Sequence, residues 1–230
     1  MVLNGFQKMT LLDFPGKVAC TLFTAGCNFR CPFCHNALLV TDIRAEDRIN
    51  EEDVLDVLRK RAGVLEGVCI TGGEPLMHPD IEELLKRIKE LGYAVKVDTN
   101  GTFPDRLADL AKAGLVDYVA MDIKNRKEKY AETAGLPGLD LIPIERSVEW
   151  LKSGIVDYEF RTTVVQEFHQ TEDIRKAAEW IRGAKRYYLQ NFVDSGNLIG
   201  ENLHPVSRET LRDMAGAAAP FVESVSTRGV

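Results

Sequence analysis

The chain has 230 residues, of which 45% are hydrophobic and 28% charged, and this content can bury a sizeable core in one α/β domain. Its net charge of -6, with basic residues interspersed among acidic ones, excludes the basic surface that nucleic-acid phosphates require. The first residues lack the pattern of a signal peptide and no stretch approaches the roughly 18 apolar residues of a membrane span, so we expect a cytoplasmic protein without membrane partners.

Alternating sequence patterns predict a parallel sheet from Val18 onward. Short β-branched or aromatic runs alternate with longer segments whose apolar residues recur at helical spacing, as in repeated βα units. The six expected strands cover residues 18–24, 67–71, 93–98, 116–123, 158–165 and 186–191.

The predicted helices begin at Asn, Pro, Thr or Ser residues, and several end at Gly. Asn50 can cap a helix whose acidic first turn favours its positive end. Pro79 suits the first turn of the next helix, which Gly92 ends. Further helices are expected over residues 104–113, 143–152, 171–182 and 207–219. No linker divides the chain, so we expect a single domain with a core at about 18–191 and a C-terminal extension at about 192–230.

The polar groups of the chain collect at the expected strand ends. Six βα units form either an open doubly wound sheet or a partial barrel, and periodicity does not separate the two. In both folds the functional residues gather where the strands end. A cysteine loop follows the first strand, GGE the second, DTN the third and DIK the fourth, while Gln190 ends the sixth and Arg161 lies within the fifth.

Three of the five cysteines, Cys27, Cys31 and Cys34, lie within eight residues. They are too close together for a set of structural disulfides, and in a reducing compartment such clustering indicates metal binding. An iron-sulfur cubane held by three cysteines has one iron with an open coordination position. A zinc site that adds His35 uses the same residue types, but adjacent ligands need an awkward turn. Cys20 and Cys69 lie within expected strands and are assigned to the core, as is usual for isolated free cysteines.

The motifs together resemble a known superfamily. The spacing C-x3-C-x2-C with Phe33 before the third cysteine, followed by GGEP at residues 72–75, resembles the radical S-adenosylmethionine (SAM) enzymes. CHN after the third cysteine, DTNG at residues 98–101 and DIK at residues 122–124 resemble the activating enzymes of glycyl radical enzymes. The opening segment up to CHN and the ending ESVSTRGV are similar to the short branch that activates anaerobic ribonucleoside-triphosphate reductase, so the similarity covers nearly the whole chain.

This resemblance implies a fold and a reaction. The fold is a partial (β/α)6 barrel of the radical SAM type, open on one side to admit a polypeptide loop. Cys27, Cys31 and Cys34 would hold a [4Fe-4S] cluster, and reductive cleavage of SAM would give a 5′-deoxyadenosyl radical that abstracts hydrogen from a glycine of a partner. The resemblance favours anaerobic (class III) ribonucleotide reductase as that partner, with a flavodoxin or a ferredoxin as electron donor.

The resemblance also assigns residues to SAM. Gly72 and Gly73 would allow close backbone approach to its methionine moiety, and Glu74 would accept a hydrogen bond from its ammonium group. Phe33 and His35 would line the adenine side. On turn chemistry alone GGEP is equally typical of a turn before a helix, and core packing alone accounts for an aromatic residue such as Phe33.

Charged residues at the third to fifth strands are assigned to the other end of SAM. Asp98, Thr99 and Asp122 would lie near its carboxylate and ribose, and the matching positions of the pyruvate formate-lyase activating enzyme help to bind a monovalent cation. Two carboxylates near an anionic group need such a counter-ion or hydrogen-bond donors. Lys124 and Arg161 are expected partners for carboxylate or ribose oxygens. Strand-end capping is the alternative for both aspartates.

Some features leave alternatives open. Gln190 stands where the pyruvate formate-lyase activating enzyme has a histidine near the ribose, so the adenosine contact there is undecided. His169 and His204 fall in expected loops, where histidines are usually exposed to solvent. The competing functions are a radical SAM enzyme for a small molecule, as in 7-carboxy-7-deazaguanine synthase, an activase of a pyruvate formate-lyase-type enzyme, and a non-catalytic metal-binding module.

Overall fold

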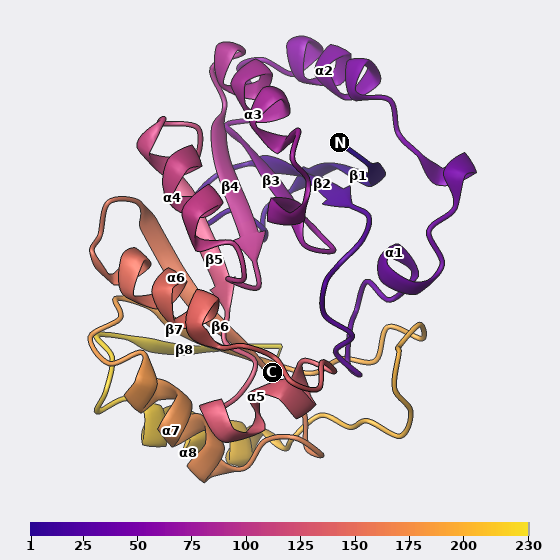
Figure 1. Ribbon diagram of the computed structural model, residues 1–230. Helices are drawn as coiled ribbons and strands as arrows, with labels where there is room; N and C mark the ends of the chain where they lie inside the picture. The colour runs from indigo at the N-terminus through magenta and orange to yellow at the C-terminus, as the bar shows by residue number, and fades with distance from the viewer. Residues whose placement is uncertain (230) are drawn as a thin grey trace.

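The computed structural model describes residues 1–229 and contains one eight-stranded sheet whose strands follow one another in chain order (Figure 1). Only β1 pairs antiparallel with its neighbour, and all later neighbours pair parallel. Within the described residues no pairing joins β1 to β8, so hydrogen bonds do not close the sheet. The strands are β1 (Leu3–Thr10), β2 (Ala19–Thr24), β3 (Gly67–Gly72), β4 (Ala94–Thr99), β5 (Tyr118–Asp122), β6 (Asp157–Val164), β7 (Tyr187–Asn191) and β8 (Val225–Arg228).

Helices follow each parallel strand up to β7 and lie on the outside of the curved sheet (Figure 1). Capping side chains mark the start of two of these helices. The Asn50 side chain accepts a hydrogen bond from the Glu52 N–H at 3.0 Å, and the Ser207 hydroxyl accepts one from the Thr210 N–H at 3.0 Å. The helices are α1 (Leu38–Thr41), α2 (Glu51–Lys60), α3 (Ile81–Glu90), α4 (Pro104–Lys112), α5 (Lys127–Thr133), α6 (Ile142–Lys152), α7 (Thr171–Trp180) and α8 (Arg208–Ala218), with short 3-10 turns η1 (Ala45–Asp47) and η2 (Pro75–Met77).

The partial-barrel prediction is confirmed, and all six expected strands are present within two residues of their predicted starts. The sequence did not predict β1 and β8, which extend the sheet at its two edges. In β1 only Leu3 and Thr10 are buried, and no residue of β8 is fully buried, so neither strand shows a clear apolar pattern. The helix expected from Pro79 begins at Ile81.

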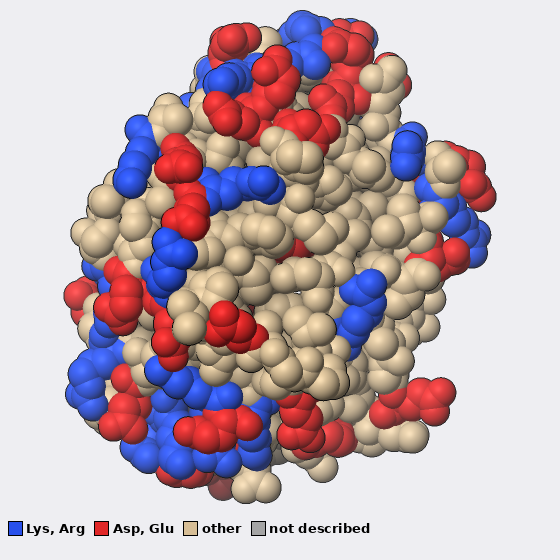
Figure 2. Space-filling model, in the orientation of Figure 1, with Lys and Arg blue, Asp and Glu red and all other residues tan. Residues whose placement is uncertain are grey.

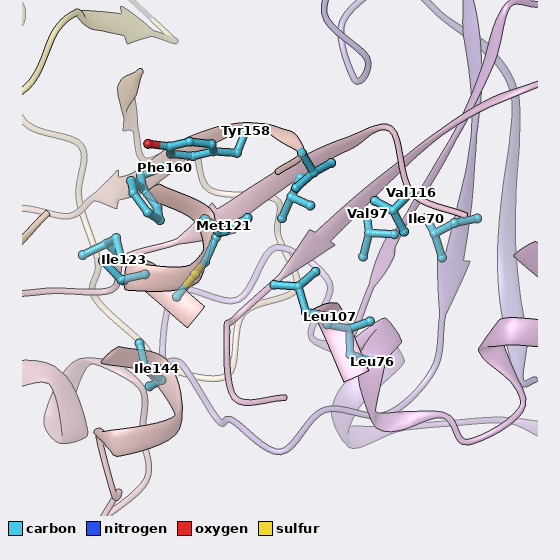
Figure 3. Packing of buried hydrophobic residues seen from close by; sticks show 14 of the residues in the cluster. Ile70, Leu76, Val97, Leu107, Val116, Met121, Ile123, Ile144, Tyr158 and Phe160 are labelled. Carbon is cyan, nitrogen blue, oxygen red and sulfur yellow. The ribbon is translucent and has the colours of Figure 1, made fainter. Parts of the chain in front are cut away.

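The two faces of the central strands carry different kinds of side chain. Because successive side chains of a strand point to opposite faces, Val95 and Val97 of β4 face the helices while Lys96 and Asp98 face the other way. The apolar face packs under the helices. Figure 3 shows two groups of core side chains, one with Ile70, Val97, Leu76 and Leu107 and the other with Met121, Ile123, Ile144 and Phe160. The opposite face carries the polar groups of the sheet.

Cys20 and Cys69 are both completely buried, and Cys20 packs in the apolar core as expected. Cys69 instead lies on the polar face of the sheet, where its Sγ is 3.6 Å from Lys96 Nζ and 3.8 Å from Asp98 Oδ1. All five cysteines are free thiols. In the part of the chain that the structure describes, no helix is long and apolar enough to cross a membrane. On the face shown in Figure 2, charged side chains gather toward the rim, and the centre is largely uncharged.

Candidate active site

A cavity of about 240 Å³ lies at the carboxyl ends of the parallel strands. The predicted convergence of strand ends is therefore observed, because every residue assigned from the sequence lines this one cavity. What each residue does there stays a prediction. The predicted residues that line it are Cys27, Phe33, Cys31, Cys34, His35, Gly72, Gly73, Glu74, Asp98, Thr99, Asp122, Lys124, Arg161 and Gln190.

The cysteine loop leaves β2 and turns back at Gly26, whose φ of 86° lies in the left-handed region that favours glycine. Its thiols are free and largely buried. Burial raises the pKa of Cys27 to about 12 and also raises the pKa values of Cys31 and Cys34. The thiols are therefore neutral unless a positively charged group binds them.

The three cysteine thiols fit the iron-sulfur cluster that their spacing predicts. Three thiols from one loop face one cavity, which provides three of the four ligands of a cubane. The Phe29 N–H donates to Cys27 Sγ at 3.4 Å, and Asn100 Nδ2 lies 3.9 Å from the same sulfur. Such N–H donors stabilise the charge on ligating sulfur. Across residues 1–229, no three His, Cys, Asp or Glu side chains are gathered around one point as the ligands of a single ion are.

A network of largely buried charged side chains lines the same cavity as the thiols. Arg161 donates to Asp98 Oδ2 at 3.0 Å and to Asp122 Oδ1 at 3.1 Å, because β5 and β6 pair with Asp122 opposite Arg161. Lys124 Nζ lies 2.8 Å from Asp122 Oδ2, and Lys96 pairs with Asp98. Three cations and two carboxylates leave the network with a formal charge of +1.

Both aspartates of this network are ionised. Burial alone raises the pKa of Asp122, but Lys124 and Arg161 outweigh it and lower that pKa to about 2. Arg161 and Lys96 likewise hold the pKa of Asp98 below its ordinary value. The wall therefore presents a net positive charge that suits an anionic group such as a carboxylate.

Lys96 is a residue of this network that the sequence analysis missed. Its side chain is only 2% exposed, on a strand whose neighbouring residues are valines. A buried lysine is rarely tolerated without a partner, and the aspartate two residues later on the same face was the available signal.

Glu74 lies on the cavity wall but is already heavily hydrogen-bonded. Its carboxylate accepts from Thr99 Oγ1 at 2.8 Å, from the Asn100 N–H at 2.7 Å and from the Leu76 N–H at 3.1 Å. Burial raises its pKa to about 7. Since a carboxylate offers about four acceptor sites, about one is left for the ammonium contact that the sequence predicts.

Two asparagines that the sequence analysis quoted only inside motifs also join the loops. Asn36 Nδ2 donates to the Gly72 carbonyl at 3.0 Å, which connects the cysteine loop to GGE. Asn100 Nδ2 donates to Asn28 Oδ1 at 2.8 Å, which connects DTNG to the cysteine loop. Their signal in the sequence was their position directly beside cysteine and strand-end motifs.

The aromatic residues that line the cavity also pack against neighbouring rings. Phe33 lies against Phe168, with ring centroids 5.8 Å apart, so core packing and cavity lining both hold for it. His35 stacks on Phe192 at 5.7 Å. The expectation that His169 is exposed is wrong: it is 2% exposed, because its ring nitrogens bond to the backbone of Lys124 and Val165.

We expect Gly73→Ala to damage this site strongly. A Cβ at Gly73 would lie 1.8 Å from the Gly26 carbonyl oxygen, so the GGE and cysteine loops would have to separate. The expected cost is about 2 kcal/mol or more of unfolding free energy, measured by urea denaturation, together with weaker SAM binding. Gly216→Ala is the control: a Cβ there would meet no atom within 4 Å apart from its own stretch of helix, so the change should be neutral or slightly stabilising. Equal stability of the two variants would contradict the close packing.

The chain is similar in sequence to a known enzyme superfamily and to several of its members. The model of the radical SAM superfamily matches residues 21–181. A protein of Methanocaldococcus jannaschii whose name gives it as a glycyl-radical enzyme activating enzyme is 30% identical over all of this chain and 96% of its own length. The 7-carboxy-7-deazaguanine synthase of Thermococcus kodakarensis is 29% identical over 72% of this chain and 71% of its own.

Among solved structures, a domain of the pyruvate-formate lyase-activating enzyme from Bacteroides vulgatus aligns with a TM-score of 0.58 at 18% identity. The alignment covers 71% of this chain and 99% of that domain. At this identity the match supports the fold alone.

Proposed function

This chain belongs to the radical SAM superfamily, and on that premise we propose that it activates a glycyl radical enzyme, with anaerobic ribonucleotide reductase as the partner. The family implies a [4Fe-4S] cluster and SAM as cofactors. The observation that carries the proposal is one cavity in which three free thiols face a buried network of net positive charge. The full-length similarity to an activating enzyme supports the choice of substrate class.

Cys27, Cys31 and Cys34 would hold the cluster. When bound and reduced, the cluster would supply one electron for the reductive cleavage of SAM to methionine and a 5′-deoxyadenosyl radical. Abstraction of a hydrogen atom from a glycine Cα of the partner would then give 5′-deoxyadenosine and a glycyl radical. The electron would come from a flavodoxin or a ferredoxin, and the free thiols suit the reducing cytoplasm.

The other residues would hold and orient SAM. Arg161 and Lys124 would attract its carboxylate, because the network around them has a net positive charge. Gly72 and Gly73 would let the backbone approach the methionine moiety, and Glu74 would use its remaining acceptor site for the ammonium group.

The adenosine end of SAM and a monovalent cation complete the proposed site. Phe33 and His35 would border the adenine, and the Gln190 amide can donate to and accept from the ribose. A monovalent cation would bind at Asp98 and Asp122, but both carboxylates already pair with side-chain cations of the protein. Electrostatics alone therefore do not require the added cation.

A small-molecule substrate is the second candidate, since the similarity to 7-carboxy-7-deazaguanine synthase also covers most of the chain. An activase of a pyruvate formate-lyase-type enzyme keeps the same chemistry with another partner. For both activase candidates the whole chain would act as one catalytic unit.

Anaerobic activation of a partner tests the proposal. The reconstituted, reduced protein is mixed with SAM and purified anaerobic ribonucleotide reductase, and the glycyl radical is followed by electron paramagnetic resonance. We expect a radical signal that requires SAM and disappears when the partner glycine is changed to alanine. A signal only with pyruvate formate-lyase would move the proposal to that partner. SAM cleavage without a radical on either partner would favour the small-molecule substrate.

A further inference from the structure

The outer edge of β8 is unpaired in the described chain. On its other side the Ser224 carbonyl accepts a hydrogen bond from the Tyr187 N–H of β7 at 2.9 Å. Because backbone groups alternate in direction along a strand, the N–H and C=O groups of Val225 and Thr227 point away from β7. In residues 1–229 no strand pairs with that side. Such an edge is a template for one more strand.

A groove of about 580 Å³ runs between this edge and α8. Val225 and Thr227 line one side, and Arg208 and Arg212 of α8 line the other. Both arginines are exposed, and within residues 1–229 neither has a carboxylate within 4.0 Å. On the adjacent α7, by contrast, Arg175 pairs with two glutamates. The groove therefore combines free backbone groups with two arginines that form no ion pair within residues 1–229.

The geometry points to an extended, acidic occupant. Arg208 and Arg212 are four residues apart on a helix, a rise of about 6 Å. Alternate side chains of a strand are about 6.6 Å apart. Acidic residues at every second position of a strand added to β8 would therefore meet both arginines. We propose that the β8 edge binds an extended segment of a partner protein with acidic residues at alternate positions.

A second copy of this chain fits the groove less well. Symmetric pairing of two β8 edges would bring the Arg208 and Arg212 side chains of both copies to one interface. Four guanidinium groups without carboxylates would repel one another. The charge distribution thus favours a partner of different sequence over a homodimer.

Side-chain contacts and strand register connect the β8 edge to the cavity. Arg228 of β8 donates to the buried Glu159 at 2.9 and 3.1 Å, and its guanidinium lies 3.5 Å from the centre of the Tyr188 ring. Arg228 also pairs in register with Gln190, which lines the cavity. A partner held at β8 would sit beside the catalytic end of the sheet. This inference concerns docking and does not depend on which reaction the cavity performs.

Peptide binding tests the proposal with the full-length protein. The probe is a fluorescein-labelled seven-residue peptide that alternates Glu and Thr, and binding is followed by fluorescence anisotropy. We expect saturable binding that weakens with salt, and the double variant Arg208→Ala/Arg212→Ala should bind about tenfold more weakly. Arg175→Ala removes the same charge from α7 and should leave binding unchanged.

A backbone variant separates strand addition from simple charge attraction. Thr227→Pro removes one outward-facing N–H, and proline is tolerated on an edge strand when that N–H does not face the sheet. Circular dichroism should show an intact fold, while the peptide should bind more weakly. Equal binding of a peptide with Lys in place of Glu, or no saturable binding, would overturn the proposal. So would dimerisation that Thr227→Pro abolishes, since a second copy would then cover the edge.

Discussion

Cys31→Ala is expected to eliminate both iron loading and SAM cleavage. Cys31 lies between the other two cysteines of the loop and lines the cavity with them, so its loss leaves only two thiols for a cluster that needs three. After anaerobic reconstitution and reduction with dithionite, iron content per chain and 5′-deoxyadenosine by chromatography are measured. Wild type should give both, and the variant should give background values.

Cys20→Ala is the matched control for this experiment. Cys20 is completely buried in β2, outside the cavity, so its replacement should cost about 1 kcal/mol of stability and leave iron and product intact. Full activity of Cys31→Ala would contradict the cluster assignment. A wild-type protein that is colourless and loaded with zinc would contradict it as well, whereas a brown, inactive wild type would show that cleavage waits for a partner.

Arg161→Ala is expected to have the second largest effect. Arg161 bridges Asp98 and Asp122, and its side chain is only 13% exposed. Removing it leaves two partly buried carboxylates with one cation each, and this loss should cost about 1–3 kcal/mol of unfolding free energy. Urea denaturation should show this loss, and equilibrium dialysis should show SAM affinity reduced about tenfold or more, because the network changes from a charge of +1 to 0.

The control replaces an arginine in a superficial pair. Arg146 pairs with Asp105, and both side chains are more than half exposed. Arg146→Ala should therefore change stability by less than about 1 kcal/mol and leave SAM affinity unchanged. If Arg161→Ala behaved like Arg146→Ala, the buried network could not be the carboxylate-binding wall that we propose.

The sequence predicts the cavity well because strand ends converge in any parallel α/β fold. Once the strand before each motif was located, topology alone placed Gly73, Asp98, Asp122 and Gln190 at one end of the sheet. The cysteine spacing added the chemistry. Neither step required knowledge of side-chain packing.

What the sequence did not predict depends on contacts between distant residues. Lys96 has its partner Asp98 only two residues away, but its burial comes from neighbouring strands, including Arg161 of β6, which shares Asp98. His169 lies in a loop, yet its ring is buried because it bonds to the backbone of Lys124. The edge strands β1 and β8 have too few buried residues to produce an apolar alternation.

The shape of the cysteine loop has a consequence for the maturation of the enzyme. The Arg30 N–H donates to the Ala134 carbonyl at 3.0 Å, and the Gly200 N–H donates to the Pro32 carbonyl at 2.8 Å. A nascent chain that has not yet emerged as far as Gly200 cannot form the second contact, although its cysteines left the ribosome long before. The loop therefore gains its full set of contacts only late in synthesis, and any thiol that is still unloaded is open to oxidation until then.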